Sequence, residues 1–418
     1  MAGSLNVMVV DDTITYRMIM KKVAESIPGI CVTSTLSNGR MALDKLTEQI
    51  TQNSRERPEA ILLDVEMPVM DGLATLKEVR KRYPQITVVM VSALSRSNAN
   101  IIMECLNAGA MDFVTKPLET NVERAKSALR KELEPILALL MQDPGKGSGT
   151  DNNRPAAAAQ ATAMPTTPPS PPSPARPAFG QTVPGPRPTF APPPPQVEKP
   201  APALQVTQVT PAPPQPGSAR KPTRPDLLLI GSSTGGPVAL AKVLGNLGEK
   251  PQVPTLIVQH MPPVFTASLA EQLSRTSGLV VKEARDDQTL LPGSVTIAQG
   301  GRHMTLQNRN GTLKLILNDG PKVNECRPAV DVLFMSVVAS FTGNIVCVIL
   351  TGMGRDGTNG VDALKRAGRT WCITQDKQSC VVYGMPRSVE EKGLSDESLP
   401  LDAIGGRITQ LCNLPVAR

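Results

Sequence analysis

The sequence predicts two α/β domains, each built on a doubly wound parallel sheet, joined by a proline-rich linker. Short, wholly apolar segments alternate with amphipathic helical stretches before residue 143 and again after residue 225. Strands of that kind are buried on both faces, which is typical of parallel sheets covered by helices. The 418 residues suffice for two or three domains. We therefore expect domains at 1–142 and 226–418 and a linker at 143–225.

The linker is predicted from its composition. Between Pro144 and Pro225 lie 24 of the 41 prolines, the runs Ala156–Ala159 and Pro192–Pro195, and few of the spaced apolar residues that a core needs. Such a segment is expected to be extended and partly polyproline-like. It serves either as a spacer or as a docking site for a proline-recognising partner, and the sequence leaves both open.

The positive charge is concentrated in the same segment. Eight basic and two acidic residues there supply +6 of the formal net charge of +7, so the two domains together are nearly neutral. A basic chain often binds nucleic acid or an anionic membrane. A basic tether between neutral domains argues against nucleic acid as a partner.

The cysteine pattern and the hydropathy indicate a cytoplasmic protein. The seven cysteines include no C-x-x-C pair and are expected to be reduced, mostly buried thiols. No apolar run approaches the roughly 18 residues that a spanning helix requires. We expect no direct insertion into a membrane.

Carboxylates lie at the ends of strands in the first domain. The strands that the pattern predicts there are Leu5–Val10, Ile61–Asp64, Ile86–Val91 and Asp112–Thr115. Asp11 and Asp12 come directly after the first strand, and Asp64 ends the Ile61–Asp64 strand. The carboxyl ends of parallel strands converge on one crevice, so these groups should cluster. Hard oxygen ligands of this kind suit Mg²⁺, which often shares its shell with a phosphate.

A hydroxyl and an ammonium are expected at the same edge. Ser92 ends the Ile86–Val91 strand, and Lys116 follows the last strand in a loop that Pro117 constrains. Both groups can bind phosphoryl oxygens. One acidic pair after a strand is weak evidence, whereas five such residues at strand ends favour a phosphate-handling site.

Over about residues 5–130 these features resemble the receiver domain of two-component response regulators. The segment Met67–Gly72 also resembles the turn that follows the phosphoacceptor in that family. The resemblance implies a flavodoxin-like receiver in which Asp64 is the phosphoacceptor. Asp11 and Asp12 would hold Mg²⁺ together with Asp64.

The resemblance also implies roles for three further receiver residues. Ser92 and Lys116 would contact the phosphoryl group, which a histidine kinase would supply. Phe113 would be the aromatic switch, although taken alone it is more readily interpreted as a core residue.

The second domain begins with a strand that runs into a glycine-rich turn. The strands predicted there are Leu227–Gly231, Thr255–Gln259, Ser294–Ala298 and Ile345–Thr351, with helices at Val238–Leu247 and Ala329–Ser340. Gly231-x-Ser233-x-Gly235 matches a nucleophile elbow, in which glycines permit a cramped turn that exposes a serine. The helix that follows offers unpaired N–H groups to an oxyanion. The same turn is compatible with a phosphate or dinucleotide cradle.

A base and a carboxylate are expected at the same edge as Ser233. His260 comes directly after Thr255–Gln259, and Asp356 lies in the loop after Ile345–Thr351. The other histidine, His303, is compatible with a structural role. Ser233, His260 and Asp356 would act as nucleophile, general base and orienting acid of a serine triad. Their order differs from the Ser, acid, His order of α/β-hydrolases, which argues against that fold.

These segments resemble the chemotaxis protein-glutamate methylesterase family, CheB, from about Asp226 to Asn413. The resemblance rests also on Gln259–Pro262, Pro328–Phe334 and Tyr383–Arg387. A receiver followed by this domain is that family's own architecture. The resemblance implies that Ser233, His260 and Asp356 are catalytic.

The resemblance further implies an oxyanion site and a substrate. The backbone N–H of Met353 would be an oxyanion donor, supported by Thr234 and Gly235. The reaction would be hydrolysis of glutamyl methyl esters on methylated, membrane-embedded chemoreceptors, and deamidation of certain receptor glutamines, in chemotaxis adaptation. The esterase domain would need no cofactor, and phosphorylation of Asp64 would relieve its inhibition by the receiver.

Two positions depart from the family pattern, and other functions remain open. Cys326 stands where the family usually has histidine, Gln299 stands where it usually has proline, and the linker is longer than usual. One alternative is an output domain that binds a phosphate-containing ligand without turnover. Another is a paralogue that acts on a receptor outside chemotaxis. A DNA-binding regulator would need a helix-turn-helix, which the nearly neutral, strand-rich second domain does not offer.

Overall fold

The structure is a computed structural model that describes residues 4–119, 121–142, 222–247 and 252–413. Except for residues 222–225, the predicted linker lies outside these ranges. The folded residues on the two sides of the linker belong to one compact unit. Each of its two sheets is described in turn.

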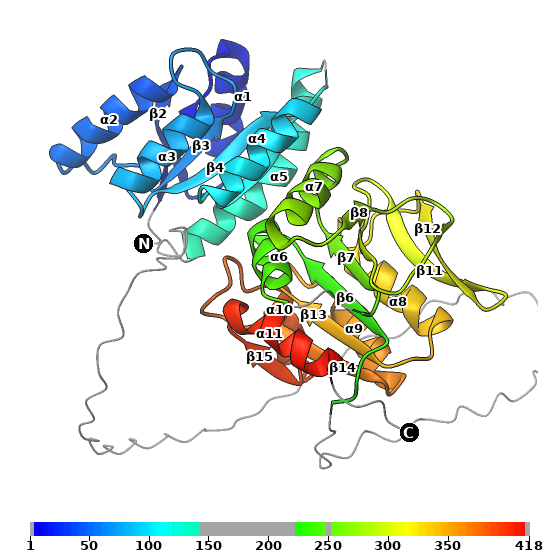
Figure 1. Ribbon diagram of the computed structural model, residues 1–418. Coiled ribbons are helices and arrows are strands. Elements are labelled where there is room, and N and C mark those ends of the chain that lie inside the picture. The colour runs from blue at the N-terminus through cyan, green and yellow to red at the C-terminus, as the bar shows by residue number, and fades with distance from the viewer. Residues whose placement is uncertain (1–3, 120, 143–221, 248–251, 414–418) are drawn as a thin grey trace, which may run out of the picture. The chain divides into compact units, whose positions relative to one another are not determined.

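The first domain has a five-stranded parallel sheet in the order β2-β1-β3-β4-β5 (Figure 1). The strands are β1 (Leu5–Val10), β2 (Ile30–Leu36), β3 (Ala60–Asp64), β4 (Thr87–Ala93) and β5 (Asp112–Lys116). The helices are α1 (Ile14–Glu25), α2 (Gly39–Thr51), α3 (Gly72–Arg82), α4 (Arg96–Asn107) and α5 (Val122–Gln142). This confirms the doubly wound fold.

The strand β2 was not among the predicted strands. It lies at the edge of the sheet, and none of its residues is fully buried. Its sequence, ICVTSTL, mixes polar and apolar residues. An edge strand of this kind lacks the wholly apolar pattern that marks the four strands found from sequence.

The second domain has a seven-stranded parallel sheet in the order β15-β14-β13-β6-β7-β10-β8. Its strands are β6 (Leu227–Ser232), β7 (Thr255–Gln259), β8 (Val281–Glu283), β10 (Val295–Ile297), β13 (Ile345–Ile349), β14 (Thr370–Gln375) and β15 (Glu397–Leu399). The strand β6 lies at the centre, between β13 and β7. The chain adds strands to one side of β6 first and then to the other, so the strand order reverses direction there. Ligand sites of open parallel sheets form at such points.

Among the described residues, six helices and a small antiparallel sheet complete this domain. The helices are α6 (Gly236–Gly245), α7 (Phe265–Ser277), α8 (Val330–Ser340), α9 (Thr358–Arg366), α10 (Met385–Glu391) and α11 (Leu401–Cys412). The antiparallel strands β11 (His303–Arg309), β12 (Thr312–Asn318) and β9 (Gln288–Thr289) were not predicted. The side chain of His303 is buried and its Nε2 lies 2.9 Å from the carbonyl oxygen of Pro321, which supports the structural role considered for it.

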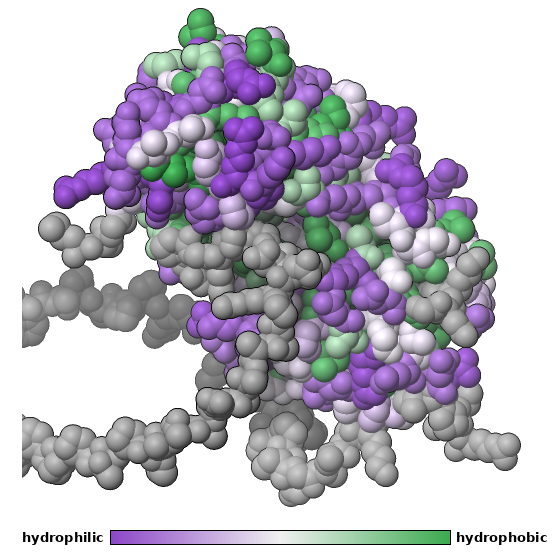
Figure 2. Space-filling model, turned by 60° about the vertical axis from the view of Figure 1, so that its left-hand side comes forward, coloured by the Kyte–Doolittle hydropathy of each residue, from purple (hydrophilic) through white to green (hydrophobic). Residues whose placement is uncertain are grey.

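The surface and the cysteines agree with the composition. The face in Figure 2 is mostly hydrophilic, and its apolar residues form small scattered groups. All seven cysteines lie within the described ranges, and none of them forms a disulfide. In the described ranges, no helix combines the length and apolarity needed to cross a bilayer.

Close packing of α8 against α9 depends on a glycine. A Cβ added at Gly360 of α9 would lie 2.5 Å from the Cβ of Phe334, which is fully buried on α8. A Cβ atom cannot move without its backbone, so the two helices would have to separate. By contrast, a Cβ added at Gly406, on the exposed face of α11, would meet nothing within 4 Å.

We predict opposite effects of alanine at these two glycines. Gly360→Ala should lower the free energy of unfolding of the second domain by about 1–3 kcal/mol through overpacking. Gly406→Ala should raise it by about 0.5–1 kcal/mol, because alanine is the better helix former. Urea unfolding followed by fluorescence of Trp371, the single tryptophan, reports on this domain alone. Equal effects of the two substitutions would contradict the packing argument.

Candidate functional site

Three adjacent central strands bring the predicted triad together in the second domain. Ser233 follows β6, His260 follows β7, and Asp356 lies in the loop after β13. The order β13-β6-β7 places these three strands side by side and parallel. All three residues therefore lie at the carboxyl edge of the sheet.

His260 and Asp356 form a buried pair. Nε2 of His260 lies 2.7 Å from Oδ2 of Asp356, and the side chains are 10% and 2% exposed. Burial disfavours a charged imidazole, but the hydrogen bonds to Asp356 and Cys326 outweigh it and raise the pKa of His260 above its usual range. Burial also opposes the charge of Asp356, yet the hydrogen bond from His260 holds its pKa below the usual value. The pair is thus suited to stabilise an imidazolium.

The other ring nitrogen of His260 faces a cysteine. Nδ1 lies 3.4 Å from Sγ of Cys326. Among the hydrogen bonds of the described residues, none joins the Ser233 hydroxyl to His260. The nitrogen that remains to activate Ser233 is therefore Nδ1, where Cys326 now lies. Catalytic hydrogen bonds are often absent or long without substrate.

The turn at Ser233 is held by glycine and by Gln259. Gly235 has a φ of +75°, and a Cβ there would lie 2.7 Å from Val381. Gln259 accepts a hydrogen bond from the Ser232 hydroxyl at 2.6 Å and donates one to the Ser233 carbonyl oxygen at 2.9 Å. These contacts fix the backbone on which the predicted nucleophile stands.

Backbone N–H groups are available beside Ser233. A Cβ added at Gly352 would lie 2.8 Å from the Cβ of Ser233, so the loop that carries Met353 touches the serine. In the described part of the chain, no hydrogen bond uses the N–H of Met353 or of Thr234. Free donors at this position suit an oxyanion.

The first domain clusters the predicted phosphoacceptor residues. Nζ of Lys116 lies 2.7 Å from Asp11 Oδ2 and 2.8 Å from Asp64 Oδ2. Burial raises the pKa of Asp64 to about 6, although Lys116 opposes this shift. Burial also opposes the charge of Lys116, but Asp64 and Asp11 outweigh it and raise the pKa of that ammonium. Ser92 is buried on β4, next to β5, which ends at Lys116.

The three aspartates have the donor set of a magnesium site. Carboxylate oxygens of Asp11, Asp12 and Asp64 lie within 4.8 Å of one another. Asp11 and Asp64 are buried, while Asp12 is exposed and lines a cleft of about 630 Å³ with Val65, Glu66 and Met67. Hard oxygens facing an open cleft fit Mg²⁺, which keeps several waters and shares its shell with a phosphate.

Phe113 and its neighbour on β5 contact the second domain. The Phe113 ring packs on Phe265 of α7 with centroids 4.6 Å apart. The hydroxyl of Thr234, next to Ser233, donates a hydrogen bond of 2.5 Å to Oδ2 of Asp112. Burial raises the pKa of Asp112 to about 6, and the bond from Thr234 opposes this.

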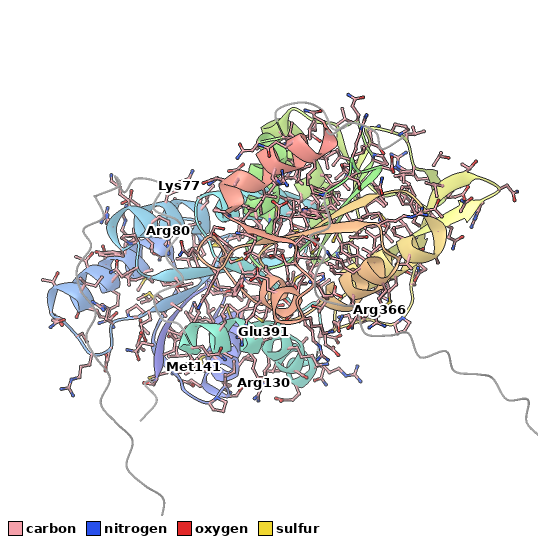
Figure 3. The ribbon with its side chains drawn as sticks, turned by 90° about the horizontal axis from the view of Figure 1, so that it is seen from below. Lys77, Arg80, Arg130, Met141, Arg366 and Glu391 are labelled. Atoms are coloured by element: carbon pink, nitrogen blue, oxygen red, sulfur yellow. The ribbon has the colours of Figure 1, made fainter. Side chains whose placement is uncertain are left out.

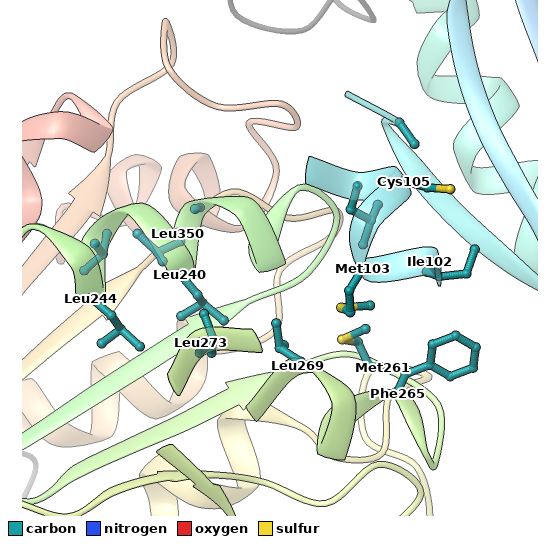
Figure 4. Close-up of a cluster of buried hydrophobic side chains, with 14 of the residues drawn as sticks. Ile102, Met103, Cys105, Leu240, Leu244, Met261, Phe265, Leu269, Leu273 and Leu350 are labelled. Atoms are coloured by element: carbon teal, nitrogen blue, oxygen red, sulfur yellow. The ribbon is translucent and has the colours of Figure 1, made fainter. Parts of the chain in front are cut away.

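Apolar side chains extend this contact. Ile102 and Met103 of α4 belong to one buried cluster with Met261, Phe265 and Leu269. In Figure 4, Met103 and Met261 point toward one another. The end of β5 opposite to Lys116 is therefore tied to the elements that carry Ser233 and His260.

A cleft of about 740 Å³ lies beside Met353. It is lined by Leu139, Leu140 and Gln142 of α5 and by Arg355, Arg387 and Glu391, among others. Figure 3 shows Met141 of α5 and Glu391 of α10 toward the lower edge of the view. Met353 itself lines the cleft, so the wall formed by the second domain includes the predicted oxyanion donor.

The two sites together define a response regulator whose output domain is a hydrolase. The response regulator receiver domain matches residues 7–127, and the CheB methylesterase domain matches residues 228–408. The chain belongs to the CheB methylesterase family.

Relatives of the same domain order extend over almost the whole chain. A protein-glutamate methylesterase/protein-glutamine glutaminase of Desulfotalea psychrophila is 37% identical and covers 98% of this chain and 99% of its own length. A protein-glutamate methylesterase/protein-glutamine glutaminase of the group 2 operon of Rhodospirillum centenum is 36% identical. It covers 97% of this chain and 93% of its own length. The CheB methylesterase catalytic domain of Thermotoga maritima is 43% identical, with a TM-score of 0.43 over 45% of this chain and all of that one.

Sequence reasoning missed several residues that contact the site. Asp112, Gln259 and Asn324 each hydrogen-bond a predicted site residue or its turn. Asp112 had a usable signal, because an acidic residue opens a strand whose next two residues, Phe113 and Val114, are apolar. Cys326 was noted only as a departure from the family pattern. Gln299 is buried to an intermediate degree and follows β10.

We predict that Cys326 sets the lower pH limit of activity. The base must be a neutral imidazole, so activity rises as the pH passes upward through the pKa of His260. Because Cys326 helps to raise that pKa, Cys326→Ala should move the acidic limb of kcat/KM to lower pH. The pH dependence of ester hydrolysis measures this. A limb that moves to higher pH, or does not move, would contradict the assigned contact.

Proposed function

We propose that this chain hydrolyses glutamyl methyl esters on methyl-accepting chemoreceptors and deamidates certain receptor glutamines, under control of phosphorylation at Asp64. The observation that carries the proposal is the buried His260–Asp356 pair at the sheet edge that also carries Ser233. The names of the relatives support the substrate class. The cytoplasmic location expected from the sequence remains a prediction.

The first half of the reaction forms an acyl-enzyme. The Ser233 oxygen attacks the ester carbonyl carbon while Nδ1 of His260 takes the hydroxyl proton. Asp356 stabilises the resulting imidazolium through Nε2. The N–H groups of Met353 and Thr234 would stabilise the oxyanion. As the C–O bond breaks, His260 returns the proton and methanol leaves.

The second half releases the carboxylate. His260 takes a proton from water, whose oxygen attacks the acyl carbon, and the same N–H groups stabilise the second oxyanion. When the bond to Ser233 breaks, His260 protonates the serine oxygen. With a glutamine substrate the leaving group is ammonia instead of methanol, and the other steps are the same.

Nucleophilic catalysis by Ser233 is tested by removing its hydroxyl. Ser233→Ala should reduce methanol release from methylated receptor membranes by about 10⁴–10⁶-fold, the usual cost of losing a triad nucleophile. It should also abolish labelling by a fluorophosphonate. Ser398→Ala, at an exposed serine on the edge strand β15, is the matched control and should change neither. Methanol release by the Ser233→Ala chain at the wild-type rate would overturn the proposal.

Control by the receiver is supported by the contacts of β5. Asp112 and Phe113 meet Thr234 and Phe265, while Lys116 at the other end of the strand binds Asp64. A phosphoryl group on Asp64 would compete for Lys116 and change the position of the strand. Bound Mg²⁺, held by Asp11, Asp12 and Asp64, would neutralise charge on the transferred phosphoryl group. A histidine kinase is the proposed phosphodonor.

We predict that a small phosphodonor such as acetyl phosphate, with Mg²⁺, raises methanol release by the wild-type chain. An increase of about 5- to 150-fold corresponds to the usual range of coupling free energies. Asp64→Asn should abolish the response. Asp112→Ala, which removes the bond to Thr234, should raise the activity of the Asp64→Asn chain without a phosphodonor. Full activation of the Asp64→Asn chain by acetyl phosphate would refute the assignment of the phosphoacceptor.

A further inference from the structure

A tight turn at Val323–Cys326 touches both buried members of the triad. Val323 and Cys326 exchange backbone hydrogen bonds of 3.1 and 2.9 Å, with Asn324 and Glu325 between them at φ of +50° and +61°. Positive φ at both central residues is the mark of a type I′ turn, in which asparagine is favoured. The turn presents Cys326 to His260 and Asn324 to Asp356.

The carboxamide of Asn324 bridges two buried carboxylates. Its Nδ2 donates to Oδ1 of Asp356 at 2.8 Å and to Oδ2 of Asp331 at 3.0 Å. Both aspartates are 2% exposed, although Asn324 itself is exposed to solvent. An NH₂ group has two hydrogens, so one nitrogen can serve both carboxylates.

Apart from Asn324, each carboxylate is held mainly by backbone N–H groups. His260 also bonds Asp356, and Nδ2 of Asn359 also donates to Oδ2 of Asp331 at 3.4 Å. Asp356 accepts from the N–H groups of Val330 at 2.6 Å and Asp331 at 3.2 Å, at the start of α8. Asp331 accepts from the N–H of Gly360 at 2.7 Å. Asn324 is therefore the side chain that connects the orienting acid of the triad to a second, structurally fixed carboxylate.

We propose that Asn324 is a positioning residue for the hydrolysis, acting through Asp356. By donating to both carboxylates it offsets their mutual repulsion and keeps Asp356 charged and aimed at Nε2 of His260. Without this donor, the pKa of Asp356 rises and the carboxylate is free to rotate away from the imidazole. The inference rests on the proposed function, since it assigns a role within the same triad.

The test separates the donor from the turn. Asn324→Gly removes the carboxamide but accepts φ of +50° at no steric cost. It should lower kcat for methanol release by about 10- to 100-fold, as for other residues that orient a reactive side chain, and leave KM within twofold. Glu325→Gly, at the neighbouring exposed residue of the same turn, is the matched control and should keep wild-type kcat.

The pH profile distinguishes positioning from a structural role. Without the Asn324 donor, Asp356 can turn away from the imidazole, so the imidazolium loses its partner and deprotonates more readily. The acidic limb of kcat should therefore move to lower pH in Asn324→Gly and stay in place in Glu325→Gly. Trp371 fluorescence without urea should show that both variants are folded. Wild-type kcat in Asn324→Gly, or an equal loss in both variants, would overturn the proposal.

A second readout keeps this inference separate from the proposed substrate. Fluorophosphonate labelling of Ser233 needs the triad but no receptor. Slower labelling of Asn324→Gly would support the positioning role even if wild-type chain released no methanol from receptor membranes, which would count against the proposed function alone. Labelling at the wild-type rate would contradict the role of Asn324.

Discussion

The geometry of the hydrolase site depends on how one buried charge is satisfied. An isolated carboxylate in a protein interior is costly unless hydrogen bonds compensate for its lost hydration. Asp356 receives them from His260 after β7, from the first N–H groups of α8 and from the Val323–Cys326 turn. The positive end of the α8 dipole adds to them. Fixing this carboxylate therefore fixes three separate elements relative to one another.

Much of this site could be predicted because it lies where parallel strands end. Ser233, His260, Asp356, Asp11 and Asp64 all follow or end strongly apolar strands, and the topology of a parallel sheet brings such positions together. Among the strands that were missed, the edge strand β2 and the antiparallel pair β11–β12 mix polar and apolar residues. Their sequence of polar and apolar residues resembles that of loops. Hydrogen bonding to a neighbouring strand is what holds these segments in an extended conformation.

The contacts between side chains far apart in sequence could not be predicted. Asp112 and Thr234 are separated by 122 positions, and nothing in either segment indicates the other. The same holds for Asn324, whose two carboxylate partners belong to different loops and helices. Such pairings depend on packing, which periodicity and motif spacing do not describe.

The strand β5 has a consequence for phosphorylation itself. Its five residues include Lys116, paired with Asp64, and Asp112 and Phe113, which contact Thr234 and Phe265. Coupling between two sites is thermodynamically reciprocal. If the aspartyl phosphate disfavours the contact with the hydrolase, that contact disfavours the aspartyl phosphate to the same extent. Contact with the hydrolase domain would then lower the fraction of receiver that is phosphorylated at Asp64. That fraction would depend on whether the two domains are in contact.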